Sequence, residues 1–306
     1  MQRSLFALTL MFLPLLAQAA TDPSMDIQAG SADRSYLLHL PDPLPNKPLP
    51  LVVVLHGGGG SAESAARMTG FDAMADKAGF IVVYPEGTDK VRPLMNMLGK
   101  PGFLTWNAGN CCGYARDNGV DDVAFIRAVV MEVIKDNGAD PKQVYATGIS
   151  NGGMMAYRLA CEASDMFAAI APVSAVQDLK ECKPAHPVSV FHIHGADDEN
   201  VPLKGGVGRK AVDEEGKTGR PPVQDSIDFW VKQDGCSVTV RSQQPDVDMV
   251  DYGACEEKTD VRLFVIKDGK HAWPGGEQIA SFLDKPSQAL DATDTIWDFF
   301  SKHQRP

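Results

Sequence analysis

The residues with the strongest chemical signal in this sequence are a serine and the glycines beside it. Residues 146–153 read Ala-Thr-Gly-Ile-Ser-Asn-Gly-Gly, which places Ser150 in a Gly-x-Ser-x-Gly pattern. A strand-like run over 143–146 precedes the pattern, and a helix-like stretch over 154–160 follows it. A sharp strand-to-helix turn lifts a serine hydroxyl clear of the backbone, and flanking glycines remove the Cβ atoms that would clash there. The pattern predicts a nucleophilic serine, with a glycine-rich surface loop as the alternative.

A second glycine cluster lies upstream at 57–60, after an apolar run over 49–55. Such a run fits a buried parallel strand that ends at the carboxyl edge of a sheet, where α/β enzymes place their sites. Attack by serine on an ester leaves negative charge on the carbonyl oxygen, and a pair of backbone N–H groups stabilises that charge. We expect the N–H groups of Gly58 and Asn151 to form this oxyanion hole. His56, where the chain turns, is expected to be structural.

A nucleophilic serine also needs a histidine to take its proton and a carboxylate to fix the tautomer of that histidine. In the chain order of α/β-hydrolases the acid and then the histidine follow the serine. Three adjacent acids at 197–199 follow a strand-like run over 188–193. We take Asp198 as the acid, because Asp-x-x-Val-Pro after a strand and His-Gly is the arrangement of related hydrolases. Asp197 is the alternative.

The general base is expected after the last strand-like run, 261–266. Only His271 and His303 follow the acid. His303 lies three residues from the end of the chain, where termini fray, so His271 is predicted to be the base. His192 and His194 fall inside a strand-like run and are expected to be packed and hydrogen-bonded.

Taken together, the motifs of this chain resemble one family of secreted esterases. They are His-Gly-Gly-Gly-Gly-Ser-Ala at 56–62, Trp-Asn-Ala-Gly-Asn-Cys-Cys-Gly at 106–113, Val-Asp-Asp-Val at 120–123, Gly-Ile-Ser-Asn-Gly-Gly-Met-Met at 148–155, His-Gly at 194–195 and His-Ala-Trp-Pro-Gly-Gly at 271–276. The family is the poly(3-hydroxybutyrate) depolymerase-like and feruloyl esterase-like group of carbohydrate esterase family 1. The resemblance covers nearly all of the mature chain and implies one α/β-hydrolase domain with the triad Ser150, Asp198 and His271. That triad agrees with the assignment from order and spacing.

The residues predict a secreted serine carboxylic-ester hydrolase that works through an acyl-enzyme, and the resemblance implies the feruloyl esterase or polyhydroxybutyrate depolymerase type. The expected substrates are feruloylated or acetylated polysaccharide fragments or a polyester, and no metal or organic cofactor is expected. An acetyl xylan esterase, a secreted acyltransferase and a peptidase are the alternatives among enzymes. A ligand-binding protein on a hydrolase scaffold is the alternative outside enzymes, and an intact Ser, Asp and His set argues against it.

Aromatic residues and two loops are candidates for substrate selection. Trp106 and Trp273 would form aromatic walls for an acyl group, with a buried scaffold role as the alternative. Residues 91–104 are methionine-rich and longer than expected in the shortest relatives, so they form either a flap over the acyl pocket or a packed surface loop. Residues 204–222, rich in Gly, Lys, Arg and Glu, predict a mobile loop.

The beginning of the chain predicts its compartment. Arg3 precedes an apolar run over 5–16, and Ala-Gln-Ala at 17–19 supplies small residues for cleavage. Residues 1–19 are therefore expected to be a signal peptide, and 20–306 one catalytic domain. No later run reaches the ~18 apolar residues of a membrane-spanning helix. The formal net charge of −11 disfavours nucleic acid and anionic lipid as partners, so we expect an extracellular or periplasmic protein without such partners.

The six cysteines all lie in the mature chain and would meet an oxidising compartment, where disulfides persist. No Cys-x-x-Cys pair is present, so a zinc site is not expected. Spacing alone does not choose among the possible pairings. The family resemblance suggests Cys236 with Cys255 and Cys161 with Cys182, leaving Cys111 and Cys112 bonded to each other or reduced.

The segments that must position these residues alternate between two patterns. Strands are expected at 35–40, 51–55, 80–84, 143–146, 168–173, 188–193 and 261–266. Helices are expected at 61–77, 121–135, 226–233 and 289–302. This alternation predicts a mostly parallel, doubly wound α/β sheet with helices on both faces. No internal repeat and no linker-like stretch follows residue 50, which favours one domain.

Overall fold

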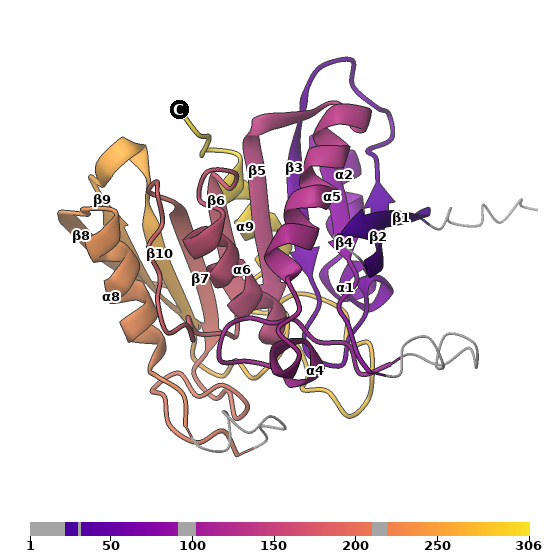
Figure 1. Cartoon of the computed structure of the whole chain (residues 1–306). Coiled ribbons are helices and arrows are strands. Elements are labelled where there is room, and N and C mark those ends of the chain that lie inside the picture. Colours follow the sequence, from indigo (N-terminus) through magenta and orange to yellow (C-terminus); the bar gives the residue numbers. More distant parts are fainter. Residues whose placement is uncertain (1–21, 30–31, 91–101, 210–218) are drawn as a thin grey trace, which may run out of the picture.

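The computed structural model shows a twisted sheet between two layers of helices (Figure 1). The structure describes residues 22–29, 32–90, 102–209 and 219–306. The expected signal peptide, most of the expected flap and part of the expected mobile loop lie outside the described residues. Among the helices that the structure describes, none is long and apolar enough to cross a membrane.

Ten strands of the described chain form one sheet in the order β1-β2-β4-β3-β5-β6-β7-β10-β9-β8. The strands are β1 Ser24–Ala29, β2 Ala32–His39, β3 Leu49–Leu55, β4 Ile81–Pro85, β5 Ala139–Ile149, β6 Ala169–Val173, β7 Ser189–Gly195, β8 Val238–Gln243, β9 Val247–Gly253 and β10 Val261–Ile266. The pairs from β4 through β10 are parallel. Antiparallel pairs complete both edges. The predicted mostly parallel α/β sheet is confirmed.

Helices cover both faces of the sheet, α5, α6 and α8 on one and α1, α2 and α9 on the other (Figure 1). The helices are α1 Ala62–Thr69, α2 Phe71–Ala78, α4 Gly113–Asp117, α5 Asp122–Asn137, α6 Asn151–Glu162, α8 Val223–Gln233 and α9 Ala292–Phe300, with a short 3-10 turn η1 at Glu256–Lys258. Along β3, Leu51, Val53 and Leu55 belong to one hydrophobic core, and Val52 and Val54 to the other. Successive side chains of a strand point to opposite faces, so burial on both faces makes β3 a continuous apolar run.

The sequence and the structure differ most clearly at the first helix. The sequence predicts one helix over 61–77, and this prediction is wrong, because α1 and α2 are separated by Gly70. Gly70 adopts a left-handed conformation with φ of 66°, and its N–H donates to the carbonyl of Ala66 to end α1. Strands β1, β8 and β9 and helix α4 are not predicted by the sequence at all. Every residue of β8 is exposed, so that strand carries no apolar run to reveal it.

Disulfides join the cysteines in the pairs that the family resemblance suggests. Cys161 bonds Cys182, which ties α6 to the connection between β6 and β7. Cys236 bonds Cys255 at the open end of the β8–β9 hairpin. Cys111 and Cys112 bond each other, so the alternative of a reduced pair is not observed.

Candidate active site

Ser150 lies in a strained turn between β5 and α6. Its φ and ψ are 56° and −124°, a region that residues other than glycine rarely adopt. The turn packs tightly against the end of β3: a Cβ at Gly148 would lie 2.5 Å from the carbonyl oxygen of Leu55, and one at Gly152 would lie 2.3 Å from the same atom. Only glycine fits at these two positions. Both glycines of the Gly-x-Ser-x-Gly pattern are therefore required by the packing of the backbone, and the expected strand–turn–helix context is confirmed.

The glycine loop after β3 lies beside the serine. A Cβ at Gly57 would lie 3.6 Å from the Cβ of the serine, and one at Gly58 would lie 3.8 Å from the Cβ of Asn151. The N–H of Gly59 donates to the carbonyl of Leu104 at 2.8 Å, whereas no described group accepts from the N–H of Gly58. The N–H of Asn151 is the first of α6 and has no partner within that helix. The structure thus brings the two residues predicted for an oxyanion hole onto neighbouring segments.

Asp198 and His271 follow two adjacent parallel strands, β7 and β10. The Nδ1 of His271 lies 2.8 Å from Oδ2 of Asp198. Oδ1 of Asp198 accepts from the backbone N–H groups of Asn200 and Val201 at 2.9 and 2.8 Å. Burial alone would raise the pKa of Asp198, but the charge and hydrogen bond of His271 together with the other donors hold that pKa below its ordinary value. The carboxylate is therefore buried, ionised and aimed at the imidazole.

Asp197, the alternative acid, lies differently. It is exposed, and its backbone N–H donates to the carbonyl of Gly269 at 2.9 Å. None of its described hydrogen bonds reaches His271, so the geometry favours Asp198. The hydroxyl of Ser150 makes no hydrogen bond to a described residue, including His271. Catalytic hydrogen bonds are often long in an enzyme without substrate and shorten in the substrate complex.

Both tryptophans considered as substrate walls are buried, Trp106 at 0% exposure and Trp273 at 1%. The indole N–H of Trp106 donates to the carbonyl of His56 at 2.9 Å, and that of Trp273 donates to the Thr293 hydroxyl at 3.0 Å. With no exposed ring face, neither can contact an acyl group, so we assign both to the scaffold. His56, expected to be structural, is buried, and its Nε2 accepts from the Gly87 N–H at 3.0 Å.

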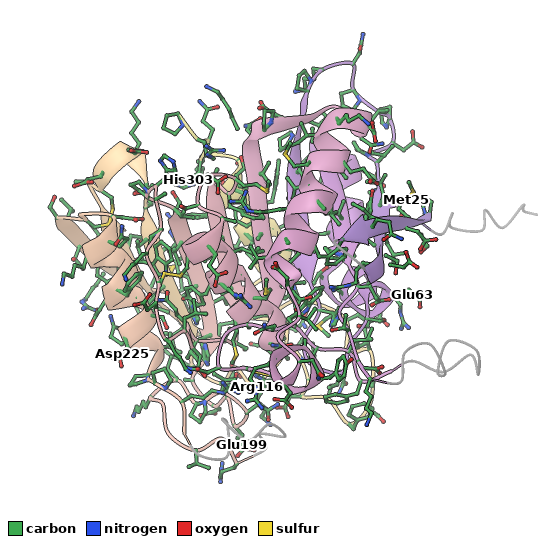
Figure 2. All side chains as sticks on the ribbon, in the orientation of Figure 1. Met25, Glu63, Arg116, Glu199, Asp225 and His303 are labelled. Carbon is green, nitrogen blue, oxygen red and sulfur yellow. A yellow bond between two sulfur atoms is a disulfide. The ribbon has the colours of Figure 1, made fainter. Side chains whose placement is uncertain are left out.

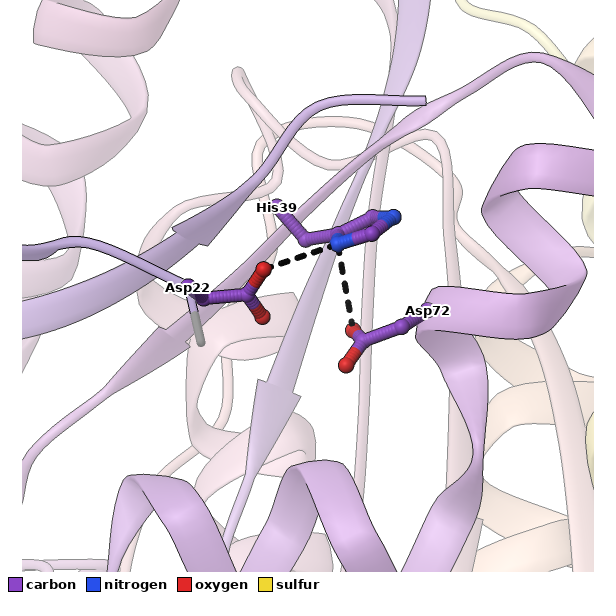
Figure 3. A group of neighbouring side chains, drawn as sticks. All are labelled: Asp22, His39 and Asp72. Carbon is purple, nitrogen blue, oxygen red and sulfur yellow. Dashed lines mark hydrogen bonds and ion pairs between the residues drawn. The ribbon is translucent and has the colours of Figure 1, made fainter. Parts of the chain in front are cut away.

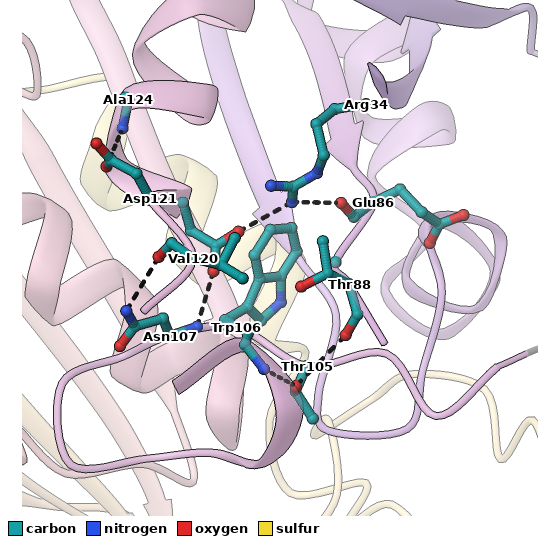
Figure 4. Close-up of polar contacts among 12 residues, drawn as sticks. Arg34, Glu86, Thr88, Thr105, Trp106, Asn107, Val120, Asp121 and Ala124 are labelled. Atoms are coloured by element: carbon teal, nitrogen blue, oxygen red, sulfur yellow. Dashed lines mark hydrogen bonds and ion pairs between the residues drawn. The ribbon is translucent and has the colours of Figure 1, made fainter. Parts of the chain in front are cut away.

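The side chain of Asn151 ties the serine turn to a second loop. Its Oδ1 accepts from the N–H of Trp106 at 2.7 Å, and its Nδ2 donates to the carbonyl of Trp106 at 3.0 Å. The backbone N–H of Asn107 donates to Asp122 at 2.8 Å, and Asp122 pairs with Arg34 at 2.9 Å. Figure 4 labels Arg34, Trp106 and Asn107 of this network. Burial raises the pKa of Asp122 although Arg34 opposes that rise. This network connects the Trp-Asn and Val-Asp-Asp-Val motifs in space, a contact that the sequence alone does not show.

One exposed aromatic ring lies beside the glycine loop. Phe103 is 60% exposed, and a Cβ at Gly59 would lie only 2.7 Å from its ring. Residues 102–104 are the described end of the expected flap, and they rest on this loop through the hydrogen bond to Gly59. Sequence reasoning missed Phe103, because a lone phenylalanine in a loop belongs to no motif. It offers an apolar surface next to the expected oxyanion hole.

The strand histidines His192 and His194 are buried and hydrogen-bonded, as the sequence predicts. His192 Nδ1 lies 2.8 Å from the Tyr157 hydroxyl, and His194 Nε2 lies 2.8 Å from the carbonyl of Val201. Neither ring reaches the surface. His194 is the nearer of the two to the acid, with its Nε2 3.6 Å from Oδ2 of Asp198.

A second ionisable cluster lies at the β1–β2 edge of the sheet and contains Asp22, His39 and Asp72 (Figure 3). His39 Nδ1 lies 2.8 Å from Asp22 and 4.0 Å from Asp72, and its Nε2 lies 2.9 Å from Asp76. Burial alone would lower the pKa of His39, but the hydrogen bonds to Asp22 and Asp76 and the charge of Asp72 raise it above its ordinary value. An imidazolium that donates both protons has no lone pair for a metal, so we interpret this group as an ion-pair cluster.

Comparisons with known sequences find esterases. Residues 34–203 match the family described as Esterase PHB depolymerase. The chain is 30% identical over 303 residues to "Putative esterase NocK" of Nocardia uniformis subsp. tsuyamanensis, an alignment that covers 92% of this chain and 83% of that protein. It is 29% identical over 249 residues to "Feruloyl esterase B" of Piromyces equi, covering 78% of this chain and 42% of that protein.

Comparison with solved structures finds esterases with a similar fold. An acetyl xylan esterase from Aspergillus awamori aligns with a TM-score of 0.60, covering 91% of this chain and 99% of that chain. The sequence identity between the two is 15%. At this identity the likeness concerns the arrangement of strands and helices, which is that of the α/β-hydrolase fold.

Proposed function

The chain belongs to the esterase PHB depolymerase family, and on this premise we propose that it cleaves carboxylic esters with Ser150, His271 and Asp198 as a catalytic triad. The observation that carries the proposal is the 2.8 Å hydrogen bond between His271 and the buried Asp198. The turn that carries Ser150 follows β5, whose carboxyl end lies at the same edge of the parallel sheet. A nucleophile, a base and an orienting acid on one edge are the requirements of serine ester hydrolysis.

In the proposed reaction the Ser150 oxygen attacks the ester carbonyl carbon while His271 takes the hydroxyl proton. Asp198 holds the Nδ1–H of His271, which leaves Nε2 free to accept that proton, and stabilises the imidazolium that forms. The N–H groups of Gly58 and Asn151 donate to the carbonyl oxygen as it becomes negative. Collapse of the tetrahedral intermediate breaks the bond to the alcohol, which receives its proton from His271. Water then repeats the sequence on the acyl-enzyme and releases the acid.

For the substrate we propose a feruloyl ester of a polysaccharide fragment or a hydroxyalkanoate polyester, with acetylated xylan as the alternative. The family and the feruloyl esterase relative support this range of esters. Phe103, exposed beside the glycine loop, supports an acyl group with apolar or aromatic surface. The leader-like residues 1–19 support secretion as part of the proposal.

Replacing the nucleophile is the direct test of the mechanism. Ser150→Ala should lower kcat by a factor on the order of 10⁶ and leave the fold intact, because no other group supplies the attacking oxygen. A serine-directed phosphonate should label wild-type protein at Ser150 only, as located by mass spectrometry. Ser174→Ala is the matched control, because Ser174 also has a positive φ, of 48°, and follows the neighbouring strand β6. Retention of more than about one per cent of activity in Ser150→Ala would rule out this mechanism.

Rates on a panel of esters would then identify the acyl group. The panel is p-nitrophenyl acetate, methyl ferulate, acetylated xylan and poly(3-hydroxybutyrate). We expect kcat/KM for methyl ferulate or for the polyester to be at least tenfold above that for acetylated xylan. The reverse order would select acetylated xylan as the substrate. Phe103→Ala should weaken binding of methyl ferulate by roughly tenfold, since an exposed ring that stacks on the acyl group contributes about 0.5–1.5 kcal/mol beyond its burial.

A further inference from the structure

Three buried side chains lie in a row behind Asp198, outside the groups that would touch an ester. They are Tyr157 on α6 and His192 and His194 on β7, each with 0% exposure. Residues two apart in a strand point to the same face, so both histidines face the layer that contains α6. Their rings are nearly parallel, at 10°, with centroids 5.2 Å apart.

The three side chains form a continuous hydrogen-bonded row. The Tyr157 hydroxyl lies 2.8 Å from Nδ1 of His192, and Nε2 of His192 lies 3.0 Å from Nδ1 of His194. Nε2 of His194 lies 2.8 Å from the carbonyl oxygen of Val201 and 3.6 Å from Oδ2 of Asp198. The row therefore ends on the turn whose backbone N–H groups hold Oδ1 of Asp198.

Hydrogen-bond chemistry fixes where each proton of the row lies. A carbonyl oxygen only accepts, so His194 carries a proton on Nε2 and donates it to Val201. A neutral imidazole has one N–H, so Nδ1 of His194 accepts from Nε2–H of His192. For the same reason Nδ1 of His192 accepts from the Tyr157 O–H. Every donor points from Tyr157 toward Val201, and one tautomer of each ring satisfies all three bonds.

The surroundings keep both rings neutral. Burial lowers the pKa of His192, and the neighbouring His194 lowers it further. Burial also lowers the pKa of His194, and the opposing effects of Asp198 and the Val201 carbonyl do not reverse that direction. His271, the other titratable group that faces His194, acts in the same direction as burial. Burial raises the pKa of Tyr157, so its hydroxyl keeps the proton that it donates.

We propose that Tyr157, His192 and His194 are positioning residues that act through Val201 to hold the 198–201 turn. In this arrangement Oδ2 of Asp198 lies 2.8 Å from Nδ1 of His271, whereas the Nε2–H of His194 is donated to Val201 and lies farther from that oxygen, at 3.6 Å. A protonated His194, only 3.6 Å from Oδ2, would compete with His271, so the neutral state of the row matters for the direction of the carboxylate. The inference rests on the proposed function, because Asp198 orients a base only if His271 is that base.

A spectroscopic test of the row does not depend on activity. Nitrogen-15 NMR of histidine-labelled protein separates the two neutral tautomers from the charged ring. We expect His192 and His194 to be neutral Nε2–H tautomers that do not titrate between about pH 5.5 and pH 8, a range that spans the ordinary histidine pKa. The His192→Gln and His194→Gln variants assign the signals. An Nδ1–H tautomer of His194, or titration of either ring in this range, would overturn the proposal.

A kinetic test separates positioning from packing. His194→Met removes the donor to Val201 at similar volume and should lower kcat on the order of 10²-fold with KM nearly unchanged, because a misplacement of about 1 Å has an effect of that size. His194→Gln retains a donor at the position of Nε2 and should recover at least about tenfold of that loss. Tyr157→Phe removes only the first bond of the row and should lower kcat roughly threefold to tenfold.

Matched controls exist at the other end of the sheet. The buried Tyr145 hydroxyl donates to the carbonyl of His303 at 2.7 Å, and the His303 ring is hydrogen-bonded to Phe299 and Asp260. His303 lies at the opposite end of the molecule from Glu199, the neighbour of Asp198 (Figure 2). Tyr145→Phe and His303→Met should lower the midpoint of thermal unfolding as the row variants do, while kcat stays within about twofold of wild type.

The outcomes distinguish this inference from the proposed function. The positioning role is wrong, while the triad stands, if His194→Met and Tyr157→Phe have the same kcat as the control variants Tyr145→Phe and His303→Met when all are compared at equal folded fraction. If Ser150→Ala keeps its activity, the triad itself is wrong, whatever the tautomers are. If His194→Met does not fold, Tyr157→Phe and the wild-type tautomers still decide the question.

Discussion

Two groups of histidines in this fold have pKa values that are shifted in opposite directions, and they also differ in depth. At the β1–β2 edge His39 has a carboxylate at each ring nitrogen, whereas in β7 His192 and His194 have each other, a tyrosine hydroxyl and a carbonyl. Burial lowers the histidine pKa in both groups, but only at the edge do the carboxylates reverse that effect. Carboxylate partners therefore outweigh burial at the partly buried His39, whereas burial outweighs the opposing groups at the fully buried His192 and His194.

His39 on the one hand, and His192 and His194 on the other, therefore have different structural effects. With a carboxylate at each ring nitrogen, His39 links residue 22, β2 and α2. A neutral ring with one proton has a direction, so a row of such rings can specify the orientation of what lies at its end.

The largest effect is expected from removing the carboxylate charge beside His271. Asp198→Asn should lower kcat by about 10⁴-fold, because an amide favours the wrong tautomer of the base. Asp76→Asn makes the same change beside His39 and should leave kcat within about twofold, since that histidine lies at the β1–β2 edge. Asp197→Asn should also have a small effect. A larger loss of kcat for Asp197→Asn than for Asp198→Asn would reassign the acid.

The next effect in size concerns the loop-closing disulfides, which lie on the half of the sheet that contains β7. Each of the Cys161–Cys182 and Cys236–Cys255 bonds should stabilise the fold by roughly 2–4 kcal/mol, because each constrains the unfolded chain. Replacing both cysteines of a pair by serine should lower the unfolding midpoint accordingly. Hydrogen exchange should show faster exchange of amides in α6 or in β8 and β9, and unchanged protection in β2 and α2. Faster exchange that begins at the β1–β2 edge would contradict this localisation.

The two histidines of the row should make the stability of the fold fall at acidic pH. Because the pKa values of His192 and His194 are lowered in the folded state, their contribution to stability is present above the unfolded pKa near 6.5 and is lost as the pH falls toward the folded pKa. The slope should approach about 1.4 kcal/mol per pH unit for each histidine. Urea unfolding of wild type and His192→Gln between about pH 4.5 and pH 8 measures the difference. A difference that does not change with pH would contradict the lowered pKa.

The stability contribution of the edge cluster should depend on pH in the opposite direction and more weakly. The pKa of His39 is raised in the folded state, so its contribution to stability is present below about pH 6.5 and is lost as the pH rises through the folded pKa. Since Asp72 and Asp76 are partly exposed, the contribution should not exceed about 1 kcal/mol. His39→Gln should therefore be less stable than wild type at pH 6 and approach it at pH 9, and salt should reduce the gap. A gap that grows with pH would show that His39 is neutral.

Much of the fold and the main site residues could be predicted from the sequence, for identifiable reasons. Strand β10 contributes buried side chains to both cores, so it appears as an apolar run interrupted only by Arg262, and it is predicted residue for residue over 261–266. The chain order of serine, acid and histidine, with the family motifs, was enough to select Asp198 and His271. The hydrogen bond between them agrees with that prediction, and their catalytic role remains a proposal.

What could not be predicted depends on residues that come together only in space. The edge cluster joins Asp72 and Asp76, one turn apart on α2, to Asp22 and His39, and no spacing in the sequence links that helix to those two residues. The row behind Asp198 needs Tyr157 from a helix to meet two strand histidines, and its direction depends on a carbonyl that no sequence pattern marks. Trp106 was a reasonable candidate for substrate contact by residue type, yet it is 0% exposed.

The position of the acid and the base on neighbouring strands has a consequence for engineering. Gly195 at the end of β7 pairs with Ile266 at the end of β10, so the separation of Asp198 and His271 is set by the spacing of two strands in the sheet. The chain between them leaves the sheet core and returns through α8, β8 and β9, and its exposed β8–β9 turn at 244–246 carries none of the site residues. Exposed turns of this kind accept insertions. The Lys267 N–H, at the end of β10, donates to the carbonyl of Asp246 in this turn. A polymer-binding module grafted there would therefore bring the enzyme to a solid substrate with acid and base still aligned, provided that the insertion leaves this bond intact.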